Sequence, residues 1–264
     1  MSPAGRDVAR RGIPLRTVVP NAVTALALCV GLSGVRFAIA EEWERAALAI
    51  FLAAILDGLD GRIARMLKGQ SRFGAELDSL SDVIAFGVSP AIILHLWSLQ
   101  YWPRVGWVFA LAYAVCTALR LARFNARIDM DDQPHKSAGF LTGVPAPAGA
   151  GLVLAPLFLW LASDRQWTIL SEIYVTAPWA ALVAFLMISN IATFSWGSLR
   201  LRQTVRLWAL AVVAIVAGAL VTAPWHTLSV AAILYAASIP FSSMSYARVK
   251  QRRRAAAASA APTN

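Results

Sequence analysis

The sequence has few of the residues that stabilise secreted domains or bind soft metals. Its 264 residues include two cysteines, Cys29 and Cys116, and both lie within apolar runs. Cysteines in such positions are typical of small buried side chains, which argues against a disulfide framework. The three histidines, His95, His135 and His226, are far apart and lack the spacing of metal ligands. A histidine-bound zinc site is therefore not expected.

Charged residues are also scarce. Asp, Glu, Lys and Arg make up 14% of the chain, although the net charge is +10. The excess of positive charge could suggest a nucleic-acid partner, but the low charged content argues against one. Basic residues in short loops beside apolar spans more simply mark the cytoplasmic side of a membrane protein.

Long apolar runs are what the sequence has instead, and 58% of its residues are hydrophobic. This share exceeds that of an ordinary soluble domain. Runs of this length predict an all-α, polytopic membrane bundle. We expect about eight transmembrane helices, at roughly 17–39, 44–67, 74–99, 105–126, 144–162, 173–194, 204–222 and 227–247.

The distribution of basic residues predicts how this bundle is oriented. The 24 Lys and Arg residues fall at the predicted inner ends of the spans, except for Arg36, Arg45, Arg104 and Arg165. This asymmetry places both termini in the cytoplasm. Residues 1–16 form a basic N-terminal segment before an uncleaved first helix, since no clear cleavage site follows. Residues 17–247 form the membrane domain, and residues 248–264 form a basic, partly disordered tail.

Four aspartates stand in this apolar context, and they form two pairs. Asp57 and Asp60 are spaced i, i+3, and Asp78 and Asp82 are spaced i, i+4. On helices, each pair shares one face. The connection 68–73 is short and polar, so the second and third helices should form an antiparallel hairpin with both pairs near its cytoplasmic end.

Carboxylates in a membrane need a cation or a water-filled cavity. Neither Cys nor His lies near these acids, and an all-oxygen ligand set suits Mg²⁺ or Mn²⁺. Two such ions could clamp a phosphoryl group. Alternatives are structural salt bridges to Arg and Lys, or a site for transporting divalent cations. We prefer a catalytic pair of ions because ionisable groups inside membranes are usually functional.

The spacing of these acids resembles that of a known family. The pattern D-x2-D-G-x2-A-R-x8-G-x3-D-x3-D is matched without a gap by Asp57, Asp60, Gly61, Ala64, Arg65, Gly74, Asp78 and Asp82. It is similar to the signature of the CDP-alcohol phosphatidyltransferases. The resemblance implies that an alcohol displaces CMP from a CDP-linked lipid, with two divalent cations, Mg²⁺ or Mn²⁺, as cofactors. It also implies a homodimer, which we expect in the bacterial inner membrane, and the distribution of Lys and Arg predicts that the site faces the cytoplasm.

The resemblance further implies a role for each matched residue. Asp57, Asp60 and Asp78 would hold the first ion, and Asp57, Asp78 and Asp82 the second, with Asp82 as the general base. The residues expected to bind the CDP-lipid are Asn21, Thr24, Gly61, Arg65, Ser71 and Gly74. For Asn21 and Thr24, helix capping or a hydrogen bond to the helix backbone is the alternative interpretation.

Three further stretches, 78–91, 119–125 and 139–148, resemble the family members that use L-serine as acceptor and CDP-diacylglycerol as donor. On this resemblance, Arg120, Arg123 and Asn125 are candidates for binding the acceptor or a lipid phosphate, because Arg grips carboxylates and phosphates with two hydrogen bonds. They could instead be positive anchors at the membrane surface. Glycerol phosphate or inositol phosphate remain alternative acceptors.

Overall fold

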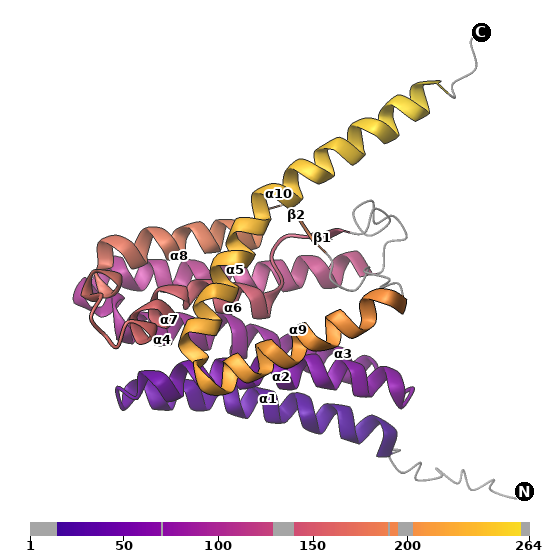
Figure 1. Ribbon diagram of the computed structural model, residues 1–264. Helices are drawn as coiled ribbons and strands as arrows, with labels where there is room; N and C mark the ends of the chain where they lie inside the picture. The colour runs from indigo at the N-terminus through magenta and orange to yellow at the C-terminus, as the bar shows by residue number, and fades with distance from the viewer. Residues whose placement is uncertain (1–14, 70, 129–139, 190, 195–202, 260–264) are drawn as a thin grey trace, which may run out of the picture.

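The computed structural model describes residues 15–69, 71–128, 140–189, 191–194 and 203–259, and this part of the chain is almost entirely helical (Figure 1). The long helices are α1 (Leu15–Ile39), α2 (Trp43–Met66), α5 (Pro103–Ile128), α8 (Ile173–Ile188), α9 (Gln203–Thr222) and α10 (Pro224–Ser259). Shorter elements lie between them: α3 (Arg72–Asp82), η1 (Val83–Val88), α4 (Ser89–Trp97), η2 (Leu99–Tyr101), α6 (Ala146–Val153), α7 (Ala155–Ala162) and η4 (Thr168–Ser171).

Helices α1 and α2 form an antiparallel pair at one side of the bundle (Figure 1). Small residues let their backbones approach closely, as is usual between membrane helices. A Cβ on Gly34 of α1 would lie 3.3 Å from the Cβ of Ala49 on α2. A Cβ on Gly31 would lie 2.8 Å from that of Ala85. These contacts hold α1 against the first half of α2 and against η1.

Elements α3, η1 and α4 together form one span, Arg72–Trp97. The helix predicted at 74–99 exists, but its middle is a π-helical turn, η1, rather than regular α-helix. This turn follows Asp82 directly and precedes Pro90, whose missing N–H prevents a regular helix here. The span then returns through η2 into α5, so the two run antiparallel (Figure 1).

Two expectations about the second half of the chain need correction. The predicted helix 144–162 is divided at Leu154 into α6 and α7, because Pro156 cannot continue the hydrogen-bond pattern. The predicted helix 173–194 ends at Ile188. Its last residues form strand β2 (Ala192–Phe194), which pairs antiparallel with β1 (Phe140–Thr142). The all-α prediction therefore holds apart from this two-stranded ribbon.

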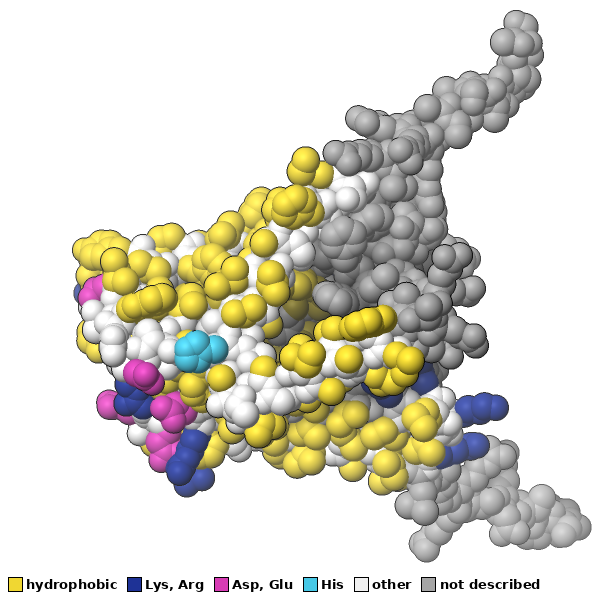
Figure 2. Space-filling model, in the orientation of Figure 1, with side chains coloured by type: hydrophobic (Ala, Val, Ile, Leu, Met, Phe, Trp, Pro, Cys, Tyr) yellow, Lys and Arg dark blue, Asp and Glu magenta, His cyan; other side chains and the backbone are white. Residues whose placement is uncertain are grey.

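The described surface is that of an integral membrane protein. Hydrophobic side chains cover the middle of the molecule, Lys and Arg project at one end, and acidic and basic groups mix at the other (Figure 2). Within the described ranges, three helices are long and apolar enough to cross a membrane: Arg16–Ile39, Arg72–Trp97 and Arg104–Ala126. Shorter apolar helices lie at Ile173–Ile188 and Leu207–Thr222. The number of eight spans stays a prediction.

The terminal segments were predicted to be basic and to lie outside the membrane. Residues 1–14 and 260–264 lie outside the described part of the chain. Helix α10 begins at Pro224 and continues to Ser259, so it extends through the first residues of the predicted tail and beyond the bundle (Figure 1). The boundaries of the membrane domain remain predictions.

Candidate active site

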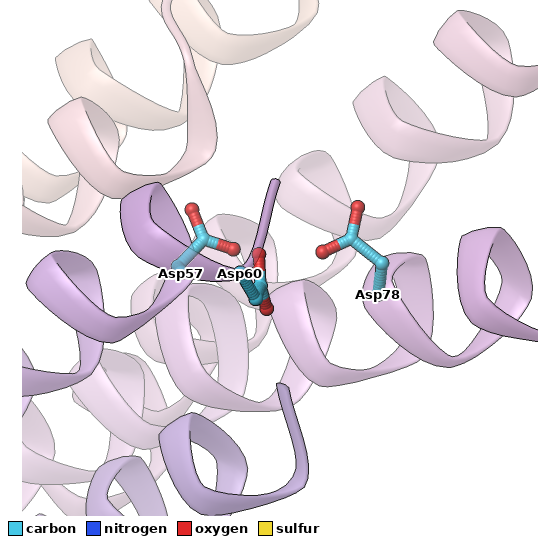
Figure 3. A group of neighbouring side chains, drawn as sticks. All are labelled: Asp57, Asp60 and Asp78. Atoms are coloured by element: carbon cyan, nitrogen blue, oxygen red, sulfur yellow. The ribbon is translucent and has the colours of Figure 1, made fainter. Parts of the chain in front are cut away.

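Three of the acids meet where the ends of α2 and α3 face each other. Asp57, Asp60 and Asp78 each offer one carboxylate oxygen, and these oxygens lie within 4.8 Å of one another. In Figure 3 the carboxylates of Asp57 and Asp78 point toward each other, with Asp60 between them. The hairpin expected from the short 68–73 connection is what produces this convergence.

Asp82 lies one turn after Asp78 on the same face of α3. Its carboxyl lies near those of Asp57 and Asp78, although it is not among the three acids whose oxygens converge. Its Oδ1 atom is buried and has no hydrogen-bond partner among the described residues. A buried oxygen of this kind has a lone pair available for a ligand or a proton.

Neutralisation of the acids by salt bridges was the structural alternative. Among the described residues the ion pairs are Arg45–Glu42 and Arg165–Glu44. Both involve the start of α2, at the opposite end of that helix from Asp57 and Asp60. Among the described residues, the acid cluster therefore has no direct ion pair, which leaves its carboxylates available to another partner.

Thr24 of α1 holds one of these acids. Its Oγ1 lies 2.6 Å from Asp60 Oδ2 and 3.1 Å from the carbonyl oxygen of Pro20. Both Thr24 and Asp60 are buried, at 5% and 4% exposure. The backbone interaction considered as the alternative for Thr24 is therefore present, together with a contact to a candidate metal ligand. Sequence spacing could not reveal this contact because it joins two helices.

A pocket of about 290 Å³ adjoins the acids. It is bounded by α1, by the end of α2 and by the start of α3. The six residues proposed from the sequence to bind the CDP-lipid all line it: Asn21, Thr24, Gly61, Arg65, Ser71 and Gly74. Asp60 and Asp78 line it as well, so the pocket opens directly onto the acid cluster.

Local structure explains why these residue types occur around the pocket. Ser71 is the N-cap of α3, and its Oγ accepts a hydrogen bond from the Gly74 amide at 3.0 Å. A Cβ on Gly74 would lie 2.7 Å from Asn21 Oδ1, so the glycine allows α1 to approach α3. A Cβ on Gly61 would meet nothing within 4 Å, so this glycine faces open space. Arg65 is exposed at the pocket's edge.

The three residues proposed for the acceptor lie on α5 but differ in their surroundings. Arg120 is half-buried, is near enough to Asp82 for their charges to attract, and has no partner for its Nε within the described part of the chain. Arg123 donates to the carbonyl oxygen of Ser189 at 3.3 Å. Asn125 donates from Nδ2 to Ser79 Oγ at 2.9 Å. The structure thus brings Arg120 to the acids and engages the other two in contacts between helices.

These features define a class of protein: a helical membrane protein with an all-oxygen acidic cluster beside a polar pocket at one end of its bundle. Residues 17–187 match the family model described as CDP-alcohol phosphatidyltransferase, and residues 205–240 match the one described as CDP-alcohol phosphatidyltransferase 2. The chain belongs to the CDP-alcohol phosphatidyltransferase family and is a transferase.

Curated relatives extend this similarity over most of the chain. A CDP-diacylglycerol–serine O-phosphatidyltransferase of Mycobacterium tuberculosis (strain CDC 1551 / Oshkosh) is 41% identical over 237 residues, which cover 90% of this chain and 82% of the relative. The protein of the same name from Mycobacterium leprae (strain TN) is 40% identical over 236 residues, or 89% and 77%. That from Helicobacter pylori (strain ATCC 700392 / 26695) is 35% identical over 177 residues, or 65% and 70%.

Proposed function

We propose that this protein transfers the phosphatidyl group of CDP-diacylglycerol to the hydroxyl of L-serine, giving phosphatidylserine and CMP. The observation that carries the proposal is the similarity to enzymes with this name across 90% of the chain. The acid cluster beside a polar pocket supports it, because the donor carries a diphosphate. In the reaction the serine oxygen bonds to the phosphorus attached to diacylglycerol, the bond to CMP breaks, and the serine hydroxyl loses its proton.

The acid cluster fits the divalent cations that the family generally uses. Carboxylate oxygens are the ligands preferred by Mg²⁺ and Mn²⁺, and the buried Oδ1 of Asp82 has no hydrogen-bond partner among the described residues. Asp57, Asp60 and Asp78 would hold one ion, and Asp57, Asp78 and Asp82 a second. When bound, such ions would supply positive charge that stabilises the developing charge on the diphosphate.

The chain's own residues would bind the substrates and move the proton. Asn21, Thr24, Gly61, Ser71 and Gly74 would line the site of the donor's nucleotide, with Arg65 beside its diphosphate. Asp82 would accept the proton of the serine hydroxyl. Arg120, whose Nε has no hydrogen-bond partner among the described residues, would bind the serine carboxylate. Arg123 and Asn125 are weaker candidates because the structure engages both elsewhere.

We further propose that the protein lies in the bacterial inner membrane with this site facing the cytoplasm, and that it is a homodimer. The orientation is supported by the Lys and Arg side chains that project at the end of the bundle where α2 ends and α3 begins (Figures 1 and 2). It would place the site where water-soluble serine and CMP are present.

The experiment is a thin-layer assay of purified protein with labelled CDP-diacylglycerol and a panel of alcohols: L-serine, glycerol phosphate, inositol phosphate and water. We expect a phospholipid product and CMP release with L-serine, and loss of both after chelation of divalent cations. A product with another alcohol instead would keep the reaction class and replace the acceptor. Uptake of Mn²⁺ into liposomes without any reaction of CDP-diacylglycerol would support the transport alternative and overturn the proposal.

A further inference from the structure

We propose that Tyr113 is a positioning residue for the acid cluster: its hydroxyl holds the π-helical turn η1 and thereby sets where Asp78 and Asp82 point. The inference rests on the proposed function only in assuming that these acids do the chemistry. Tyr113 lies on α5 and is fully buried, and its hydroxyl donates to the carbonyl oxygen of Phe86 at 2.8 Å.

The backbone explains why that carbonyl needs a partner. In a regular α-helix, Phe86 would receive a hydrogen bond from the N–H of residue 90, but residue 90 is proline and has none. The turn is instead π-helical, as shown by the Ser89 N–H, which bonds to Ile84 five residues earlier. Because Pro90 has no N–H, the backbone at this turn offers one donor fewer than a regular helix would, and an unsatisfied buried carbonyl is strongly unfavourable in a membrane. The Tyr113 hydroxyl supplies a donor from the neighbouring helix.

A π-helical turn also changes the direction of side chains along the span. It inserts one extra residue, which rotates everything before it by roughly 100° relative to everything after it. The segment before the turn carries Asp78 and Asp82, which face α2, and the segment after it packs into the core through Ile93 and Leu94. If η1 were regular α-helix, Ile93 and Leu94 could still face the core, but Asp78 and Asp82 would then point away from α2. Alternatively, the two acids could face α2, and Ile93 and Leu94 would then leave the core.

Three further contacts join α5 to the same span and continue toward the acids. Thr117 packs against Gly87 of η1, where a Cβ would lie 3.1 Å from Thr117 Cγ2. Arg120 lies near Asp82, and Asn125 is bonded to Ser79 beside Asp78. Tyr113, Thr117 and Arg120 are spaced i, i+4, i+7 and so share one helix face. On this face of α5, Tyr113 contacts η1, and Arg120, about two helical turns further along α5, lies near Asp82.

The chain contains a matched example away from the acids. Pro156 leaves the carbonyl of Leu152 without its helical donor, and the indole Nε1 of Trp179 on α8 bonds to that oxygen at 2.7 Å. The two bonds satisfy the same need in the backbone. They differ in that only the Tyr113 bond lies on the span that carries acidic ligands. The Trp179 bond therefore provides a control for stability alone.

The test compares Tyr113→Phe with Trp179→Phe in purified full-length protein. For Tyr113→Phe we expect kcat to fall roughly 10-fold or more, because small displacements of reacting groups strongly lower the reaction rate. We expect the Mn²⁺ concentration for half-saturation, measured by electron paramagnetic resonance without substrates, to rise roughly 10-fold, as when a group supporting metal ligands is lost. Trp179→Phe should lower Tm while Mn²⁺ affinity stays as in the wild type.

A second variant separates positioning from simple satisfaction of a carbonyl. Pro90→Ala in the Tyr113→Phe background returns an N–H to Phe86, so Tm should recover while kcat and Mn²⁺ affinity stay low. Recovery of all three would show that Tyr113 only fills a hydrogen-bond requirement, and would overturn the proposal. So would a Tyr113→Phe protein with wild-type Mn²⁺ affinity and kcat. The Mn²⁺ measurement needs no acceptor, so it stands even if serine proves not to be the acceptor.

Discussion

At the scale of single residues, two aspartates with the same side chain have different surroundings. Asp60 is 4% exposed, and its Oδ2 accepts a hydrogen bond from the Thr24 hydroxyl. Asp82 has a buried oxygen with no hydrogen-bond partner among the described residues, and Arg120 lies nearby. A carboxylate held by a hydroxyl is oriented for a fixed ligand, whereas an unoccupied oxygen can accept a proton. These differences support metal binding for Asp60 and base catalysis for Asp82.

Replacing Asp82 by asparagine tests the second role. Asn is nearly isosteric but cannot take up the proton of a hydroxyl at neutral pH. We expect serine-dependent CMP release to fall by roughly 10²–10⁴-fold, as is usual when a general base is lost. The measurement is CMP release from purified protein, with membrane insertion checked by fractionation. Full activity in an inserted Asp82→Asn protein would refute the assignment of the base.

Replacing Thr24 by valine tests how Asp60 is held. Valine keeps the shape of the side chain but removes the donor that lies 2.6 Å from Asp60. We expect Mn²⁺ affinity to fall about 10–100-fold, the usual effect of removing a partner of a metal ligand. Thr222→Val is the matched control, because among the described residues the Thr222 hydroxyl bonds to backbone carbonyls of its own helix, those of Gly218 and Ala219. Equal Mn²⁺ affinity in both variants would remove Thr24 from the site.

At the scale of elements, prolines recur where helices carry functional or irregular geometry. Pro90 follows the π-helical turn and Pro156 follows the break between α6 and α7. In each case a side chain from another helix bonds to the carbonyl four residues earlier. The hydrogen bond lost within one helix thus becomes a contact between two helices, which fixes their relative positions.

The contact between α1 and α3 depends on a glycine. Gly74→Ala would place a methyl group 2.7 Å from Asn21 Oδ1, although alanine favours helix by about 1 kcal/mol. We expect KM for CDP-diacylglycerol to rise several-fold because Asn21 and Ser71 line the pocket. Gly218→Ala on α9, where a Cβ would meet nothing within 4 Å, should leave KM unchanged. A Gly74→Ala enzyme with wild-type KM would show that α1 can move away without affecting the donor.

The sequence predicted most elements but not their irregular parts. Apolar length predicted α1, α2 and α5 within a few residues, because these helices are set by local composition and polar turns. The π-helical turn, the break at Leu154 and the β1–β2 pairing depend on partners far along the chain. Pro90 and Pro156 signalled an interruption, yet their sequence positions could not name Tyr113 or Trp179 as the compensating donors.

At the scale of the whole molecule, the prediction concerns orientation. Single cysteines at Arg72 and at Gln166, in a background with Cys29→Ala and Cys116→Ala, occupy exposed positions on α3 and in the α7–η4 connection. We expect a membrane-impermeant maleimide to label Gln166→Cys in intact spheroplasts and Arg72→Cys only after permeabilisation. The reverse pattern would place the acids on the outer face and contradict the cytoplasmic site.

The spacing of the motif predicted the residues of the site more completely than composition predicted the number of membrane spans. The four acids and the six pocket residues were all named from the sequence, and the structure brings them into one region. Spacing succeeds here because each acid pair lies within a single helix turn and the hairpin connection is short. The number of spans was harder to obtain, because α2 is 24 residues long but carries charged residues toward both ends.

The arrangement of groups around the acids has a stereochemical consequence. The pocket lies toward α1 and includes Asp60 and Asp78, whereas Arg120 approaches from α5 beside Asp82. If CMP leaves toward the pocket and the acceptor is held by Arg120, the acceptor would attack the phosphorus from the side opposite the departing CMP. Attack from the side opposite the departing nucleotide inverts the configuration at phosphorus. CDP-diacylglycerol made chiral with sulfur and oxygen isotopes should accordingly give a product of inverted configuration, whereas retention would require a covalent phosphatidyl-enzyme.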